Sequence, residues 1–136
     1  MKNRTTSFSL LHMADLHIGK TLKGKDLAED QRFVLNQVVA QAGRLAPDAV
    51  LICGDVFDRL IPSESSLVLF GRFLADLRTA LPSEAPIVVL PGNHDSSSRL
   101  AYAAELLKPV NIHIVDRIDT EPVAVLEKEG ARLAIW

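Results

Sequence analysis

The chain has 136 residues, of which 48% are hydrophobic, and this is enough apolar surface for one globular domain with a buried core. The formal net charge is −2, so the charge of the whole chain does not indicate a nucleic-acid partner, and any basic footprint has to be local. A single cysteine, Cys53, excludes an internal disulfide, and no apolar run is long enough to span a membrane. We therefore expect a cytoplasmic protein.

Apolar runs and helical periodicity alternate along the chain. Strands are predicted at residues 8–13, 49–53, 87–90 and 112–115, and helices at 27–45, 62–81 and 99–108. Two further apolar runs, 123–126 and 132–136, flank a Glu-Lys-Glu-Gly segment and predict a β-hairpin. This order predicts an α/β fold with a parallel sheet built from βα units, whose later strands turn antiparallel.

The two long helices differ in their apolar content. The first is predicted to bury one face, formed by Phe33, Val34, Val38, Ala42 and Leu45. The second carries more apolar residues than one face can hold, over 67–77. Its surplus is covered either by a partner chain or by its own domain, and the pattern alone leaves both readings open.

Polar motifs follow three of the predicted strands, at the point where each strand ends. They occupy residues 15–17 (Asp-Leu-His), 54–58 (Gly-Asp-Val-Phe-Asp) and 92–95 (Gly-Asn-His-Asp). Because the carboxyl ends of parallel strands meet at one edge of a sheet, we expect these motifs to lie together. Asp15, His17, Asp55 and Asn93 carry oxygen and nitrogen donors that suit two divalent ions, separated by about 3.5–4 Å in the usual binuclear arrangement.

Several neighbouring side chains have a predicted role in catalysis or substrate binding. His94 is placed to stabilise a transition state or to protonate a leaving oxygen, with Asp95 orienting its ring. Arg59 either contacts a phosphate or forms a local ion pair with Asp58. Three lysines shortly after His17 are either a local phosphate-binding cluster or an ordinary solvated surface: Lys20, Lys23 and Lys25.

Together, these motifs resemble those of the calcineurin-like metallophosphoesterases, which have a sandwich fold, and their fuller strings look like the SbcD type of DNA repair nuclease subunit. The resemblance implies that Asp15 and His17 bind the first metal, that Asp55 bridges both metals, that Asn93 binds the second and that His94 is catalytic. It implies manganese as the metal, with exonuclease activity on double-stranded DNA and endonuclease activity on single strands. It also implies an SbcC-type ATPase partner, a location at the bacterial nucleoid, and a homodimer formed through helices at 67–81 and 99–108.

Two departures from the family pattern affect this interpretation. Arg59 is followed by Leu60, whereas the phosphatase branch usually has glycine there, and this disfavours a protein phosphatase. The later histidine motifs of the family do not occur before Trp136. We therefore expect residues 1–136 to be the N-terminal portion of a nuclease domain, binding manganese weakly and with little activity alone. The alternatives are a phosphodiesterase or phosphatase for small phosphoesters, and a non-catalytic dimerisation module.

Overall fold

A four-stranded parallel sheet forms the centre of the protein. The computed structural model describes residues 6–117 and 120–136. The sheet contains β1 (Leu10–Ala14), β4 (Ala49–Cys53), β5 (Ile87–Leu90) and β6 (Ile112–Ile114), in that spatial order and all parallel. The predicted strands at 49–53 and 87–90 are confirmed in full, and the other two differ by one or two residues at their ends.

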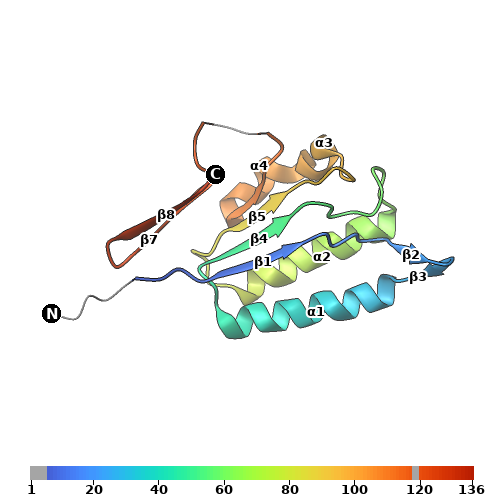
Figure 1. Cartoon of the computed structure of the whole chain (residues 1–136), viewed down its shortest axis with the longest axis horizontal. Helices are drawn as coiled ribbons and strands as arrows, with labels where there is room; N and C mark the ends of the chain where they lie inside the picture. The colour runs from blue at the N-terminus through green and yellow to red at the C-terminus, as the bar shows by residue number, and fades with distance from the viewer. Residues whose placement is uncertain (1–5, 118–119) are drawn as a thin grey trace.

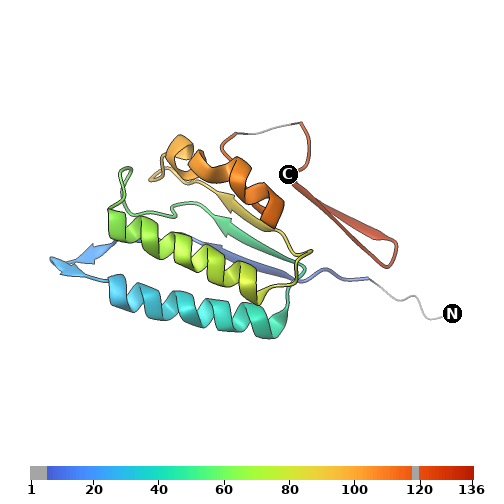
Figure 2. The same ribbon diagram turned by 180° about the vertical axis from the view of Figure 1, so that it is seen from behind.

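The long helices α1 (Ala28–Leu45) and α2 (Glu64–Ala80) lie side by side on one face of the sheet, in front of the strands in Figure 2 and behind them in Figure 1. Each strand is added beside the previous one, so every crossover runs in the same direction. Because parallel crossovers are almost always right-handed, such an order places successive helices on the same face. Among the residues that the structure describes, no helix covers the opposite face, and alternate β1 residues, including His12, are exposed there.

The core lies between this sheet and the helices. Val50, Ile52, Ile87 and Val89 contribute fully buried side chains from β4 and β5, and Leu77 of α2 is buried against the same cluster. Burial on this scale, at about 25 cal/mol per Å² of apolar surface, is the main force that fixes the strands in register. It therefore also fixes where each strand ends.

The apolar face predicted for α1 is wrong in part. Phe33 and Val34 are 65% and 57% exposed, and the buried positions are Leu35 and Ala42, with Val38 partly covered. At 3.6 residues per turn, Phe33 lies nearly opposite the stripe formed by positions 35, 38 and 42, and Val34 lies at the edge of that stripe. Leu45, also predicted to be buried, is 57% exposed at the end of the helix. The predicted start of α2 is confirmed. Ser63 caps the helix by accepting a hydrogen bond from the Ser66 N–H.

The third predicted helix is interrupted. It consists of α3 (Ser97–Leu100), a 3₁₀ turn η1 (Ala101–Ala103), α4 (Ala104–Leu107) and a second 3₁₀ turn η2 (Lys108–Val110). Leu100 is the one buried residue of these four pieces. A short segment with so few buried contacts lacks the packing that holds a regular α-helix, and 3₁₀ turns are a common result.

Two small hairpins lie outside the main sheet. β7 (Ala124–Lys128) and β8 (Ala131–Ile135) form the predicted hairpin, but as a separate two-stranded sheet, so the expectation that the main sheet itself turns antiparallel is wrong. Lys128 Nζ lies 3.0 Å from Asp48 Oδ1, and this ion pair joins the hairpin to the segment between α1 and β4. β2 (Thr21–Leu22) and β3 (Lys25–Asp26) form a second hairpin where a loop was expected.

Within the described ranges, none of the helices combines the length and apolarity that crossing a membrane requires.

Candidate metal centre

The loops that follow β1 and β4 are hydrogen-bonded to each other beyond the ends of the strands. The Asp15 N–H donates to the Gly54 carbonyl at 3.3 Å, and the His17 N–H donates to the Asp55 carbonyl at 2.9 Å. The parallel pairing of β1 with β4 therefore continues through the motif residues themselves. As a result, side chains that are 38 to 40 positions apart in the sequence lie next to one another.

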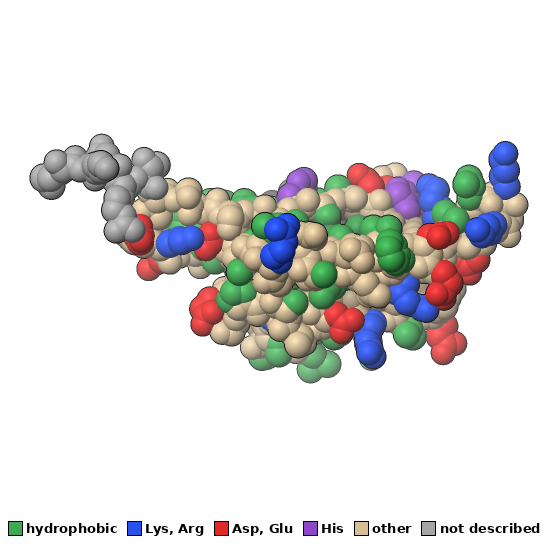
Figure 3. Space-filling view, turned by 90° about the horizontal axis from the view of Figure 1, so that it is seen from below, with side chains coloured by type: hydrophobic (Ala, Val, Ile, Leu, Met, Phe, Trp, Pro, Cys, Tyr) green, Lys and Arg blue, Asp and Glu red, His purple; other side chains and the backbone are tan. Residues whose placement is uncertain are grey.

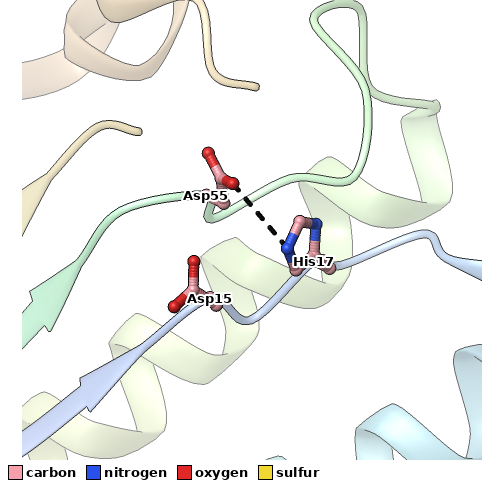
Figure 4. A group of neighbouring side chains, drawn as sticks. All are labelled: Asp15, His17 and Asp55. Carbon is pink, nitrogen blue, oxygen red and sulfur yellow. Dashed lines mark ion pairs between the residues drawn. The ribbon is translucent and has the colours of Figure 1, made fainter. Parts of the chain in front are cut away.

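Asp15, His17 and Asp55 form a group that could hold a metal ion. One donor atom from each lies within 4.8 Å of the other two, and His17 Nε2 is 3.7 Å from Asp55 Oδ2 (Figure 4). In Figure 4 the Asp15 carboxylate and the His17 ring both point toward Asp55. Two carboxylates and an imidazole are a donor set that divalent transition metals accept, so the residues present fit such an ion.

All three residues of this metal group adopt the left-handed backbone conformation. Their φ angles are 55° at Asp15, 44° at His17 and 33° at Asp55. Residues other than glycine rarely adopt this conformation, and it is concentrated at functional sites, where surrounding bonds hold it in place. Here the bonds between the β1 and β4 loops supply that support.

The second ring nitrogen of His17 faces another carboxylate. Its Nδ1 is buried and has no hydrogen bond, although Asp58 Oδ1 lies 3.2 Å away, outside hydrogen-bond alignment. Asp58 Oδ1 is also 3.7 Å from Lys20 Nζ. A carboxylate beside Nδ1 favours the tautomer that carries its proton there, which leaves the Nε2 lone pair free to face Asp15 and Asp55. Of the two readings left open for Arg59, an ion pair with Asp58 is not seen among the described residues, where Asp58 instead contacts His17 and Lys20.

Asn93 and His94 lie beside this group on the loop after β5. The His94 N–H donates to Asp55 Oδ1 at 2.9 Å, and its ring stands edge-on to the His17 ring with 5.4 Å between centroids. His94 Nδ1 lies 3.4 Å from the Asp58 carbonyl oxygen. Asn93 directly precedes His94, and its side chain is exposed. The structure therefore brings the third motif to the other two, as predicted.

The prediction for Asp95 requires a correction. Its carboxylate is buried and accepts hydrogen bonds from the backbone N–H groups of Val56, Phe57 and Gly92, at 2.8–2.9 Å. Both oxygens are thus engaged by the backbone, and the nearest contact of the His94 ring is to Asp58 instead. Two of the three donors belong to the β4 loop, 38 and 39 positions away, so a contact between distant loops decides the orientation of Asp95.

The three lysines lie on or next to the β2–β3 hairpin. Lys23 and Gly24 form its two-residue turn, both with positive φ, so Lys23 is held at the tip and Lys25 in the second strand. Lys20 is drawn back to Asp58. Figure 3 shows acidic as well as basic side chains at this end of the molecule. This end is therefore of mixed charge and not a uniformly basic patch.

Arg59 lines a cavity of about 510 Å³ next to the loops that carry the metal group. Ile18 and Gly19, which directly follow His17, form one side of it, and Arg59, which follows Asp58, forms another. The rest of its polar wall consists of four hydroxyl-bearing residues and one carboxylate: Thr21, Ser63, Ser65, Ser66 and Asp26. The loops after β1 and β4, which carry the metal group, therefore also form part of the cavity wall.

Two other titratable residues near the sheet differ from the site residues. Burial raises the pKa of the Cys53 thiol, which keeps it protonated at neutral pH and makes it a poor metal ligand. Burial, with a smaller contribution from Lys108, lowers the pKa of His113, whose Nε2 lies 2.9 Å from Asn111 Oδ1. Neither residue belongs to the metal group.

A model of the calcineurin-like phosphoesterase family matches residues 8–133, which is nearly the whole chain. The chain belongs to the calcineurin-like phosphoesterase family. This calcineurin-like phosphoesterase is accordingly a metal-dependent hydrolase, and its parallel sheet with helices is consistent with the fold of that family. The family uses divalent metals, and the metal group at the strand ends could hold one.

Sequence reasoning did not foresee three features of this phosphoesterase: the contact of Asp58 with His17, the backbone bonds of Asp95 and the β2–β3 hairpin. The sequence does contain a signal for this hairpin. Lys23-Gly24 lies between the short segments 21–22 and 25–26, and a glycine there suits a two-residue turn that needs positive φ. The two aspartate contacts have none, since each joins residues about 40 positions apart.

Proposed function

We propose that this calcineurin-like phosphoesterase is a DNA nuclease subunit of the SbcD type, acting in bacterial DNA repair and recombination at the nucleoid. It would cleave phosphodiester bonds as a double-strand exonuclease and a single-strand endonuclease, together with an SbcC-type ATPase. The observation that carries the proposal is the Arg59 cavity, whose lining includes the two residues that directly follow His17 and two residues of the lysine-bearing hairpin.

The site residues have distinct roles in this proposal. Asp15 and His17 hold a first ion, Asp55 bridges two ions, and Asn93 holds the second. When bound, two divalent ions, with Mn²⁺ as the proposed metal, supply Lewis-acid stabilisation at the phosphoryl oxygens and an activated water. His94, exposed beside Asp55, donates a proton to the leaving oxygen.

The Arg59 cavity favours a substrate with more than one phosphate. A guanidinium group can bind phosphate oxygens in bidentate fashion, and the hydroxyl-bearing residues Ser63 and Ser65 line the same space, together with one carboxylate, Asp26. A phosphate that flanks the scissile bond of a polynucleotide would fill it, and Lys23 and Lys25 would contact the backbone further away. A small phosphoester has no group to place there.

The test measures two activities of the purified protein in the presence of Mn²⁺: hydrolysis of a DNA duplex and hydrolysis of bis(p-nitrophenyl) phosphate. Arg59→Ala is expected to slow DNA hydrolysis by about 10-fold and to leave the small diester unaffected, since a lost charged hydrogen bond is worth roughly 1.5 kcal/mol. Arg72→Ala, on the exposed surface of α2, serves as the matched control. Hydrolysis of the small diester alone would favour a small-molecule phosphodiesterase, and metal binding without any hydrolysis would favour a non-catalytic module.

The proposal includes a homodimer formed through α2 and the helical segment 97–110. An apolar groove of about 160 Å³ runs between these elements, lined by Leu60, Leu67, Phe70 and Leu107 among others. Leu67 is 51% exposed and Tyr102 is 91% exposed at its margins. Apolar side chains that gather around one groove are typical of a protein interface.

Analytical ultracentrifugation tests the dimer. Leu67→Glu is expected to convert it to a monomer, because an unpaired carboxylate would be buried in the interface. Phe33→Glu, on the exposed side of α1, changes an equally apolar and similarly exposed residue away from the groove, and should leave the dimer intact. A wild-type protein that remains monomeric at high concentration would refute the interface.

A further inference from the structure

The carboxylate of Asp95 joins the two loops that follow β4 and β5. Its Oδ2 accepts from the N–H of Val56 at 2.9 Å and of Gly92 at 2.8 Å, and its Oδ1 accepts from the N–H of Phe57 at 2.9 Å. Asp95 is 7% exposed, so these three donors replace the water that the charge has lost. Two of the donors belong to the β4 loop, and one belongs to the β5 loop.

A reciprocal bond runs in the opposite direction. Asp55 of the β4 loop accepts from the N–H of His94 of the β5 loop at 2.9 Å. Gly92 lies so close to Asp55 that an added Cβ would overlap its N and Oδ1 atoms. Each loop thus presents a carboxylate that accepts hydrogen bonds from the backbone of the other loop, and the two loops pack closely where Gly92 meets Asp55. The pairing takes over where the parallel ladder ends, at Cys53 and Leu90.

We infer that Asp95 is a positioning residue that sets the distance between Asp55 and Asn93, and with it the affinity for the second metal ion. It acts through the backbone of both loops and contacts neither the ion nor the substrate. Outer groups that hold metal ligands in place commonly contribute 10- to 100-fold to metal affinity. The inference rests on the ligand roles proposed above for Asp55 and Asn93, and is independent of DNA as the substrate.

Asp95 can be separated from a residue that merely stabilises the fold. Asp15 and His17 lie on the β1 loop, which none of the bonds of Asp95 reaches. A positioning role therefore predicts unequal effects on the two ions: the one shared with Asn93 is weakened, and the one at Asp15 and His17 is largely retained. General destabilisation would affect both ions alike.

The experiment titrates Mn²⁺ into the metal-free 136-residue chain and follows free Mn²⁺ by electron paramagnetic resonance. Asp15→Asn and Asn93→Ala assign the two binding events in the wild-type chain. Asp95→Asn keeps the shape but turns an amide NH₂ toward a backbone donor, and it is expected to weaken the second event by roughly 10- to 100-fold and the first by less than about 3-fold. Leu77→Ala, which creates a cavity in the core of α2 far from the loops, is the destabilised control and should change neither affinity.

Equal weakening of both events, or no change in a folded Asp95→Asn chain, would overturn the positioning role while leaving the ligand assignment intact. A wild-type chain with no second binding event would overturn both. If Asp95→Asn does not fold, Asp95→Glu provides the same test, because it keeps the charge but moves it by one methylene. Loss of the second event in a folded Asp95→Glu chain supports the inference, and wild-type affinity for both ions contradicts it.

Discussion

Gly92→Ala should severely destabilise the protein, although it adds one methyl group to a loop. The φ angle of Gly92 lies outside the left-handed region, so alanine meets no backbone penalty there and the effect is purely steric. The new Cβ would overlap Asp55 N and Oδ1 and would lie 2.9 Å from Asp55 Cγ. Two of these atoms belong to a side chain that is itself held by the His94 N–H, and the third is backbone, so the loops have to separate.

The magnitude follows from two contributions. Overpacking of this kind costs about 1–3 kcal/mol. Separation of the loops also breaks at least one hydrogen bond to a carboxylate, which is worth about 1.5–3 kcal/mol. The free energy of unfolding should therefore fall by about 3–6 kcal/mol, a large share of the 5–15 kcal/mol that is typical of a domain.

Urea unfolding followed by circular dichroism measures this change. With a slope of about 1.5 kcal/mol per M, a loss of 3 kcal/mol lowers the midpoint by about 2 M. Gly43→Ala is the matched control. Gly43 lies in α1, and its new Cβ would meet Ala80 of α2 at an ordinary contact distance of 3.5 Å. That variant should gain about 0.5–1 kcal/mol from helix propensity. A loss below about 1 kcal/mol for Gly92→Ala would refute the close packing of the loops.

Three further substitutions test individual contacts. Asp58→Asn removes the charge beside His17 Nδ1 and should weaken Mn²⁺ binding about 10-fold in a calorimetric titration, whereas unchanged affinity would exclude Asp58 from the site. The backbone hydrogen bond from Ser9 lowers the pKa of Asp48 below its ordinary value of 3.8, so this carboxylate stabilises the fold above that pH and stops doing so as the pH falls through its folded pKa. Asp48→Asn should therefore lose about 1 kcal/mol at neutral pH and progressively less as the pH falls through the folded pKa of Asp48 in urea titrations, and a pH-independent loss would contradict this cause. Ser63→Ala removes the α2 cap and should cost about 1 kcal/mol in thermal unfolding, and an unchanged midpoint would show that the cap is dispensable.

The sequence predicted the strand ends well because burial controls them. β4 and β5 are continuous apolar runs that are bounded by turn residues, and most of their residues are buried. The association of three motifs at one sheet edge follows directly from that placement. The grouping of Asp15, His17 and Asp55 could therefore be predicted from the order of strands and motifs alone.

The wrong predictions share a physical origin. Phe33 and Val34 are apolar, but which residues of a helix are buried depends on its rotation about its own axis, and contacts with other elements set that rotation. Asp95 was expected to orient its sequence neighbour, His94, but three backbone donors, two of them from a distant loop, compete for it more strongly. Local patterns contain neither kind of long-range contact.

The left-handed backbone at Asp15, His17 and Asp55 has a consequence for laboratory evolution. Each of these residues raises the free energy of the folded state by on the order of 1 kcal/mol compared with glycine, which adopts such angles freely. A library of variants selected only for thermal stability should therefore accumulate glycine at Asp15 or His17. The selected proteins would be more stable but would lack these metal-binding donor atoms. At these positions the demands of folding and of chemistry oppose each other through a single backbone angle.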